Sequence, residues 1–109
     1  MSVDAVGEPL KLLLVEDNDA HAEMVKRSFE QHKVSNEIYH VDDGQKALDY
    51  IFREGEYSDE EKYPRPHCIL LDLRLPKVDG LEVLRRIKGD DSTRKTPVVI
   101  LTTSSADKD

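Results

Sequence analysis

The sequence predicts an α/β domain in which a parallel β-sheet is covered by helices on both faces, a doubly wound arrangement. Three short apolar runs, "KLLLVED" (11–17), "HCILLDL" (67–73) and "TPVVILTT" (96–103), are typical of strands that are buried on both faces. Strands that alternate with helices of this length favour right-handed βαβ units. With 109 residues, the chain is long enough for one such domain and too short for two.

Helices are predicted wherever apolar residues recur every three or four positions. The first helix has two candidate N-caps, Asn18 and Asp19. The polar stretch 55–66, with two prolines, is expected to be a long loop and a solvated spacer rather than a docking surface. The predicted elements are, in chain order, a strand at 11–17, a helix at 18–33, a strand at 36–42, a helix at 43–54, the loop at 55–66, a strand at 67–73, a turn at 74–80, a helix at 81–89, a loop at 90–95 and a strand at 96–103.

The composition excludes several classes of protein. The 16 basic and 23 acidic residues give a net charge of −7, which disfavours non-specific binding to nucleic acid or to an anionic membrane. No apolar run approaches the roughly 18–20 residues of a membrane-spanning helix. The single cysteine, Cys68, cannot form an internal disulfide, so a reducing, cytoplasmic location is expected. Residues 1–9 lack the basic and apolar regions of a secretion signal, and we expect them to be a flexible leader.

Each of the three predicted buried strands ends in polar side chains. Glu16 and Asp17 follow the first run, Asp72 the second, and Thr102 and Thr103 the third. In an open parallel sheet, ligands bind at the edge where the carboxyl ends of the strands meet. Because adjacent residues on a regular strand point to opposite faces, the first two acids can act together only where the strand gives way to its turn. We therefore expect three carboxylates and two hydroxyls to gather at this edge.

Clustered carboxylates need a cation, and the ligand type predicts which one. Oxygen ligands with room for water suit Mg²⁺, and the regular acid spacing of a Ca²⁺ loop is not found in the sequence. A Mg²⁺ site beside a carboxylate and a hydroxyl can transfer a phosphoryl group. Taken singly, each acid could instead be a helix cap or a solvated loop residue. The histidines and the cysteine show no zinc-like pairing and are interpreted as surface or core filler: His21, His32, His40, His67 and Cys68.

Three motifs, in the right order, resemble the receiver domain of two-component response regulators. They are "LLLVEDN", "ILLDLRLPKVDGLEVLRRIK" and "PVVILTTS", and they cover nearly all of residues 10–109. The most specific piece is "DLRLPKVDG". The acidic loop and the "LTTS" ending look most like small single-domain receivers that partner phytochrome-type and related sensor histidine kinases. The resemblance implies a flavodoxin-like (βα) fold with strand order 2-1-3-4.

The resemblance also implies a phosphotransfer role for the acids at the strand ends. Asp72 would be the phosphoacceptor, which takes a phosphoryl group from a histidine of the kinase. Mg²⁺ would be bound by Asp17, by Glu16 directly or through water, by Asp72 itself and by the main-chain carbonyl of Arg74.

Further residues would shape the site and respond to its phosphorylation. Thr102 would be the switch hydroxyl that moves toward the phosphoryl group and so changes a partner-binding surface, and Thr103 would flank the mouth of the pocket. Pro76 and Gly80 would shape the turn behind the phosphoacceptor, and Asp79 would cap the following helix.

Such receivers continue beyond the third motif, and that continuation has no match in this sequence. A further helix, a fifth strand preceded by a lysine, and a last helix are all missing, since Lys108 comes too early. We therefore expect residues 10–109 to be a receiver domain that is incomplete at its C-terminus. The strand at 96–103 would then be a sheet edge with unpaired main-chain groups, and we expect the chain to dimerise or exchange elements through it.

Two other functions are considered. A Mg²⁺-dependent phosphatase with an aspartate nucleophile usually has a second acid two residues later, where this chain has Arg74. A pseudo-receiver that serves only for protein contact would have lost its acids. We therefore expect a self-phosphorylating signalling domain, not a turnover enzyme, whose phosphate comes from a sensor histidine kinase or a phosphotransfer protein. The sequence identifies no downstream effector.

Overall fold

The computed structural model describes residues 9–31, 35–75 and 77–101. The order of its elements agrees with the order predicted from the apolar runs. Pro76, Thr102 and Thr103, to which the resemblance gives roles, lie outside the described residues, as do residues 1–8 of the predicted leader. The elements are β1 (Leu10–Val15), α1 (Asp19–Gln31), β2 (Asn36–Val41), α2 (Gly44–Ile51), the 3-10 helix η2 (Gly55–Ser58), β3 (Cys68–Asp72), α3 (Gly80–Gly89) and β4 (Val98–Leu101).

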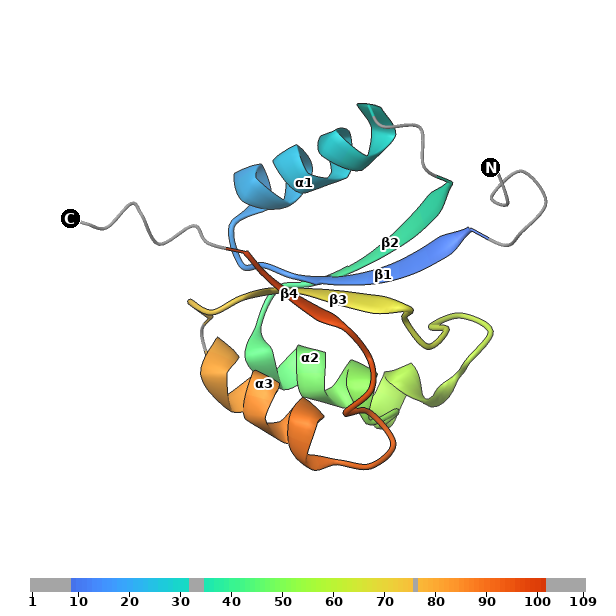
Figure 1. Cartoon of the computed structure of the whole chain (residues 1–109), viewed down its shortest axis with the longest axis vertical. Helices are drawn as coiled ribbons and strands as arrows, with labels where there is room; N and C mark the ends of the chain where they lie inside the picture. The colour runs from blue at the N-terminus through green and yellow to red at the C-terminus, as the bar shows by residue number, and fades with distance from the viewer. Residues whose placement is uncertain (1–8, 32–34, 76, 102–109) are drawn as a thin grey trace.

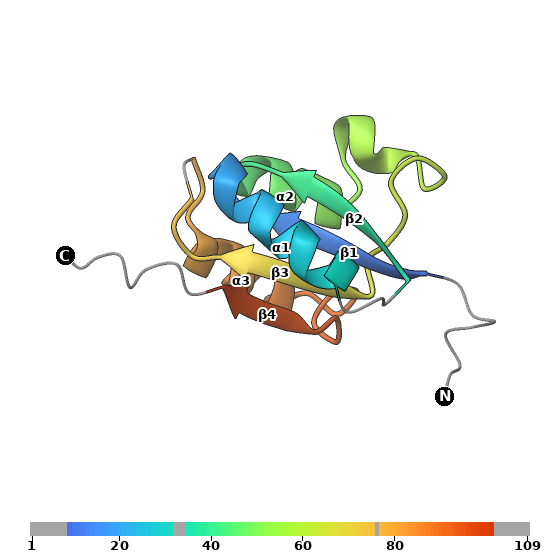
Figure 2. The same cartoon turned by 90° about the horizontal axis from the view of Figure 1, so that it is seen from above.

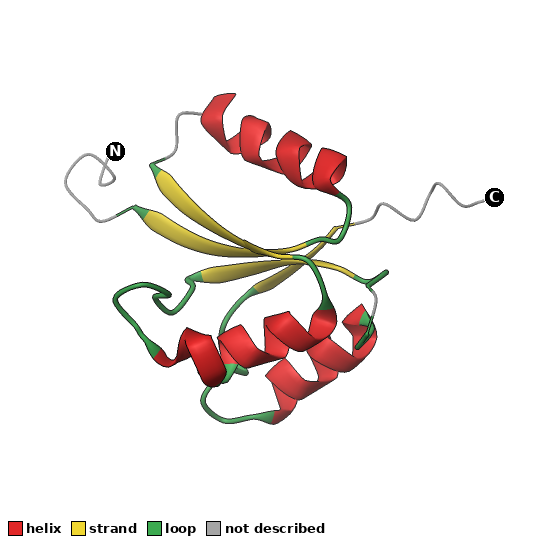
Figure 3. Ribbon diagram, turned by 180° about the vertical axis from the view of Figure 1, so that it is seen from behind, coloured by secondary structure: helices red, strands yellow, loops and turns green. Residues whose placement is uncertain are grey.

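The four strands form one parallel sheet in the order β2-β1-β3-β4, which confirms the predicted strand order. Figure 2 shows the strands side by side in this order. One face of the sheet carries α1, and the other carries α2 and α3 (Figures 1 and 3). None of the helices in the described ranges is long and apolar enough to cross a lipid bilayer.

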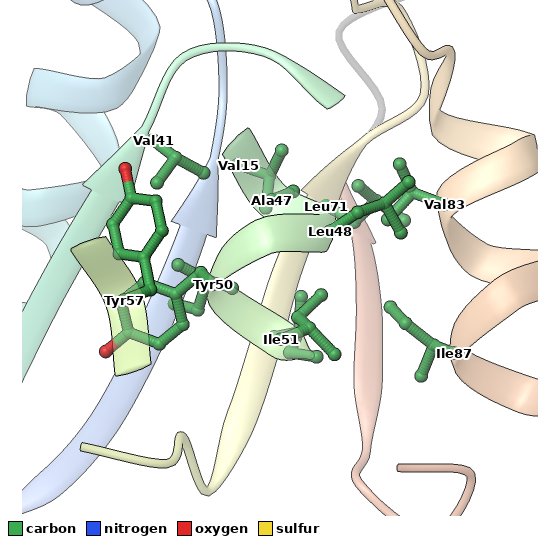
Figure 4. Close-up of a cluster of buried hydrophobic side chains, with 12 residues drawn as sticks. Val15, Val41, Ala47, Leu48, Tyr50, Ile51, Tyr57, Leu71, Val83 and Ile87 are labelled. Carbon is green, nitrogen blue, oxygen red and sulfur yellow. The ribbon is translucent and has the colours of Figure 1, made fainter. Parts of the chain in front are cut away.

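The apolar runs are continuous because the strands pack against helices on both faces. In β1, Leu12 and Leu14 belong to a cluster with Ala22 of α1. The alternate residues, Leu13 and Val15, belong to a larger cluster formed with α2 and α3 (Figure 4). A strand with one solvent-facing side would alternate apolar with polar residues, so the unbroken run in β1 is explained by its position between two cores.

Three helices begin at a short polar side chain that accepts a main-chain N–H from three residues further on. The distances are 3.0 Å for Asn18 at α1, 2.7 Å for Asp43 at α2 and 3.0 Å for Asp79 at α3. The predicted caps at Asn18 and Asp79 are therefore confirmed. The second helix is shorter than predicted, because it begins after its Asp43 cap and ends at Ile51.

Most of residues 55–66 are exposed, as predicted for a loop, but the segment is more than a solvated spacer. The short helix η2 turns Tyr57 into the core, where only 8% of its surface is exposed. Its ring lies 5.3 Å from the ring of Tyr50 on α2 and 4.8 Å from that of Tyr63, measured between centroids. Tyr39 on β2 extends the group, with its ring centroid 6.3 Å from that of Tyr50. Aromatic packing therefore holds this loop against the domain.

Hydrogen bonds from α2 hold the same loop. The hydroxyl of Tyr50 donates to the carbonyl of Pro64 at 2.8 Å. The guanidinium of Arg53, just beyond the helix, donates to the carbonyl of Tyr63. Arg53 itself has a left-handed backbone with φ of 62°, which turns the chain out of α2 and into the loop.

Candidate functional site

Three carboxylates meet at the carboxyl edge of the sheet. Glu16 and Asp17 follow β1, and Asp72 ends β3. The two strands are neighbours in parallel register, with Val15 opposite Leu71, so the acids that come next arrive side by side. One carboxylate oxygen from each of the three acids lies within 4.8 Å of the others. The structure thus brings together the three acids that the strand ends predicted, whereas Thr102 and Thr103 lie outside the described residues.

The two adjacent acids reach the same cluster because β1 gives way to its turn at Glu16. The main-chain N–H of Glu16 still donates to Val41 of β2 at 3.1 Å. The side chain of Glu16 then accepts the main-chain N–H of Asn18 at 3.2 Å, which curls the chain toward α1. Glu16 is almost fully buried, with 1% of its surface exposed, while Asp17 is exposed in the turn. One acid is therefore held by packing, and the other by the conformation of the main chain.

The environment of Glu16 fits a bound cation. Burial raises the pKa of its carboxyl above the ordinary value; the Asn18 N–H opposes this shift, and the negative charge of Asp72 adds to it. Within the described residues, the buried oxygen Oε1 of Glu16 has no hydrogen-bond partner. A divalent cation would satisfy that oxygen and neutralise the crowded negative charges. The donor set, carboxylate oxygens on an edge open to water, is the kind that Mg²⁺ accepts.

The phosphoacceptor candidate Asp72 is held by the residues that follow it. Only 3% of its surface is exposed, and its Oδ1 accepts the main-chain N–H of Arg74 at 3.0 Å. This bond fixes the carboxylate relative to the turn that leaves β3. The resemblance assigns the main-chain carbonyl of Arg74 to the metal; the contact seen here is made by its N–H, and the role of the carbonyl stays a prediction.

The turn after Asp72 packs so closely that two positions admit only glycine. A Cβ on Gly80 would lie 2.4 Å from the Cα of Leu73 and 2.6 Å from the carbonyl oxygen of Asp72. A Cβ on Gly44, at the start of α2, would lie 1.7 Å from the carbonyl oxygen of Val78. Both distances are far below van der Waals contact. The predicted shaping role of Gly80 therefore has a steric basis, and α2 supports the same turn through Gly44.

Two histidines that the sequence analysis took for filler lie against Glu16. The Nδ1 atom of His21, in the first turn of α1, is 3.6 Å from Glu16 Oε2. The Nε2 atom of His40, on β2, is 2.7 Å from the main-chain oxygen of Glu16. The interpretation as filler therefore misses the contacts that these two residues make with Glu16. The signal for His40 lies in the pairing of β1 with β2, which places Leu14 opposite His40, and sequence spacing alone does not give that register.

The sequence has recognisable relatives. Residues 12–109 match the family model described as the response regulator receiver domain. The chain is 48% identical over 103 residues to the probable methanogenesis regulatory protein FilR2 of Methanothrix harundinacea, covering 94% of this chain and 63% of FilR2. It is 41% identical over 106 residues to the response regulator Rcp1 of Synechocystis, covering 97% of this chain and 70% of Rcp1. The chain thus spans less than two thirds of the length of FilR2.

Solved structures agree with these relatives. The phosphorylated cyanobacterial phytochrome response regulator RcpA superposes with a TM-score of 0.78 at 42% identity, over 85% of this chain and 64% of that one. The Mn²⁺-bound form of Rcp1 gives a TM-score of 0.80 at 43% identity, over 88% of this chain and 67% of that one. With its 2-1-3-4 parallel sheet and its acids at the strand ends, this chain belongs to the response regulator receiver domain family.

Proposed function

We propose that this domain receives a phosphoryl group on Asp72 with the help of Mg²⁺. One observation carries the proposal: Glu16, Asp17 and Asp72 place carboxylate oxygens within 4.8 Å of one another. Like charges at such distances are costly unless a cation binds among them. When bound, Mg²⁺ would neutralise charge on the phosphoryl oxygens and align the donor. The match to Mn²⁺-bound Rcp1 supports a divalent ion, and the oxygen ligands favour Mg²⁺ as the resident one.

The chain's own residues would carry out the transfer. A carboxylate oxygen of Asp72 attacks phosphorus, the bond between phosphorus and the donor nitrogen of a phosphohistidine breaks, and the donor imidazole leaves with that electron pair. The Arg74 N–H, bonded to Oδ1, keeps the Asp72 carboxylate oriented during this step. Thr102 would contact the phosphoryl group and shift the partner-binding surface between two populations. The result is a domain that stores a signal as an acyl phosphate and does not turn over substrate.

The donor would be a sensor histidine kinase or a phosphotransfer protein in the cytoplasm. RcpA is named as a phytochrome response regulator, which supports a kinase of the phytochrome type as the partner class. The net charge of −7 does not favour nucleic acid as a direct partner.

The test is phosphorylation by a small donor. The chain is incubated with acetyl phosphate and Mg²⁺, and its intact mass is measured. We expect one labile adduct of about 80 Da, the mass of HPO₃. Asp72→Asn should give none, removal of Mg²⁺ with EDTA should prevent it, and Asp91→Asn, at an exposed aspartate in the α3–β4 loop, should leave it unchanged.

Two results would contradict the proposal. An adduct that persists in Asp72→Asn would place the acceptor elsewhere. Repeated release of phosphate from a phosphate ester, in excess of the protein, would show a phosphatase.

A further inference from the structure

We propose that His40 is a positioning residue for the metal site, because its side chain fixes the peptide that joins Glu16 to Asp17. The inference rests on the proposed function, since it concerns how the same cation is bound. Its basis is the 2.7 Å contact between the Nε2 atom of His40 and the main-chain oxygen of Glu16. A carbonyl oxygen can only accept a hydrogen bond, so Nε2 carries the hydrogen and donates it.

The contact occurs where the main-chain ladder between β1 and β2 ends. The last ladder bond in this direction runs from the N–H of Glu16 to the carbonyl of Val41, at 3.1 Å. In a continuing parallel pair, the N–H of Asp43 would next donate to Glu16. No such bond is found among the described residues: β2 ends at Val41, and Asp43 is the N-cap of α2. The side chain of His40 therefore takes the place of the missing main-chain donor.

The bond controls Asp17 through the planarity of the peptide group. The carbonyl of Glu16 and the N–H of Asp17 lie in one rigid plane, so a donor that fixes the oxygen also fixes the direction in which Asp17 leaves the strand. Glu16 is buried and held by packing, but Asp17 is exposed and lacks such support. The direction in which the Asp17 carboxylate points therefore depends on the conformation of the main chain. Partners that orient ligands in this way affect metal affinity without contacting the metal.

His40 is not an apolar core residue. It is half-buried, and with Asp19, Asp42, Lys46 and Tyr57 it lines a polar cavity of about 220 Å³ beside the site. Replacing it therefore does not open a hole in either apolar cluster. This makes loss of the hydrogen bond separable from loss of packing.

The chain contains a control, a second histidine whose ring is bonded to the main chain. At the opposite end of β1, the main-chain N–H of Lys11 donates to Nδ1 of His67 at 2.9 Å. His67 is bonded to β1 itself and His40 to the residue that follows β1, so only His40 makes its contact beside the acids. A general loss of strand stability would follow from either substitution, whereas a loss of metal affinity is expected from His40 alone.

The test compares divalent-ion affinity and folding in the same variants. Mg²⁺ binding is measured by calorimetry, Mn²⁺ binding by the loss of the free-ion signal in electron paramagnetic resonance, and stability by thermal unfolding in EDTA. His40→Leu should weaken both ions about tenfold, the size typical of lost outer partners of a metal site. His40→Gln, whose amide nitrogen reaches as far as Nε2 and can donate, should restore affinity to within about threefold, whereas the shorter His40→Asn should not. His67→Leu should bind both ions as the unsubstituted chain does.

Other outcomes would overturn the inference. Unchanged affinity in His40→Leu, or an equal loss in His67→Leu, would remove the positioning role while leaving the proposed function intact. If His40→Leu does not fold, the test is the comparison of His40→Gln with His40→Asn. Equal metal affinities of these two variants would overturn the positioning role of His40. Absence of Mg²⁺ and Mn²⁺ binding by the unsubstituted chain would overturn both this inference and the proposed function.

Discussion

At the scale of single residues, Gly80 determines how closely the turn after β3 approaches Asp72. A Cβ at this position would lie 2.6 Å from the carbonyl oxygen of Asp72 and 2.4 Å from the Cα of Leu73, both of them main-chain atoms that cannot move alone. We expect Gly80→Ala to lower the free energy of unfolding by about 2–3 kcal/mol, in the range of overpacking substitutions. It should also slow phosphorylation of Asp72. Urea denaturation and the intact-mass assay measure the two effects.

Gly89 is the matched control for Gly80. It ends the same helix, α3, and a Cβ there would meet nothing within 4 Å. Gly89→Ala should leave stability unchanged or raise it by about 0.5 kcal/mol, because alanine loses less backbone entropy on folding. A Gly80→Ala protein that is as stable and as readily phosphorylated as Gly89→Ala would contradict the close approach.

Glu16 makes the metal-free protein sensitive to pH. Its pKa is raised in the folded state, so the folded chain binds this proton more tightly than the unfolded chain. The stabilisation that comes from this bound proton is fully present below the ordinary pKa of 4.5. It is lost as the pH rises through the raised pKa of Glu16 in the folded chain. Glu16→Gln cannot ionise and avoids that loss. In EDTA, the Tm of this variant relative to the unsubstituted chain should therefore increase as the pH is raised from 4.5 to neutral.

The control for this measurement is Glu23→Gln, at an exposed glutamate on α1. This substitution removes a carboxylate without removing a buried charge, so it isolates the effect of burial at Glu16. Added Mg²⁺ should raise the Tm of the unsubstituted chain more than that of Glu16→Gln. A Tm difference for Glu16→Gln that is flat with pH would show that the folded chain does not raise this pKa.

At the scale of elements, residues 55–66 contribute to the core through Tyr57. The ring packs against Tyr50 and Tyr63, and its surface is almost entirely covered. We expect Tyr57→Ala to lower the free energy of unfolding by about 3 kcal/mol, at the lower end for large aromatic truncations. Glu60→Ala, at an exposed position of the same loop, should change it by less than about 0.5 kcal/mol. Equal effects in urea denaturation would mean that the loop does not pack as described.

Most elements were predictable because their signals are local. The unbroken apolar run 12–15 predicts a strand that is covered on both faces, and the caps Asn18 and Asp79 mark helix starts through short polar side chains. The meeting of Glu16, Asp17 and Asp72 followed from a rule for the carboxyl ends of parallel strands. These inferences needed only the residues of each segment and a general property of parallel sheets.

The failures involve contacts between segments far apart in the sequence. "GEYSDEEKYPRP" reads as polar because its two tyrosines stand alone in the sequence, and their packing depends on Tyr50 of α2. His40 looked like filler because its partner, the carbonyl of Glu16, is brought to it by the register of β1 with β2. Such contacts depend on how distant segments pair and pack, which the periodicity of a single segment does not reveal.

At the scale of the whole molecule, the described sheet has an edge at β4. This strand pairs with β3 alone, and Val99 in its middle is 48% exposed. We expect the 109-residue chain to self-associate through this edge, because unpaired main-chain groups recruit another strand. The molar mass from light scattering should rise with protein concentration. Val99→Lys should remove the rise, since a lysine on an edge strand opposes pairing.

Leu81 provides the control for this edge. It is 62% exposed, but on α3 rather than on β4. Leu81→Lys should leave the association unchanged if the sheet edge is responsible. A chain that stays monomeric at every concentration, or a Leu81→Lys protein that alone becomes monomeric, would rule out the edge as the contact.

Through the close contact of Gly44 with Val78, α2 connects the turn that leaves Asp72 with the tyrosine-lined loop. One end of this helix touches the turn that leaves Asp72, and its other end, roughly 12 Å away for eight residues, leads into the tyrosine-lined loop. Because packed interiors transmit strain rather than absorb it, we expect any displacement of that turn to move α2 as a whole. A change at Asp72 would then reach the loop that follows the far end of α2.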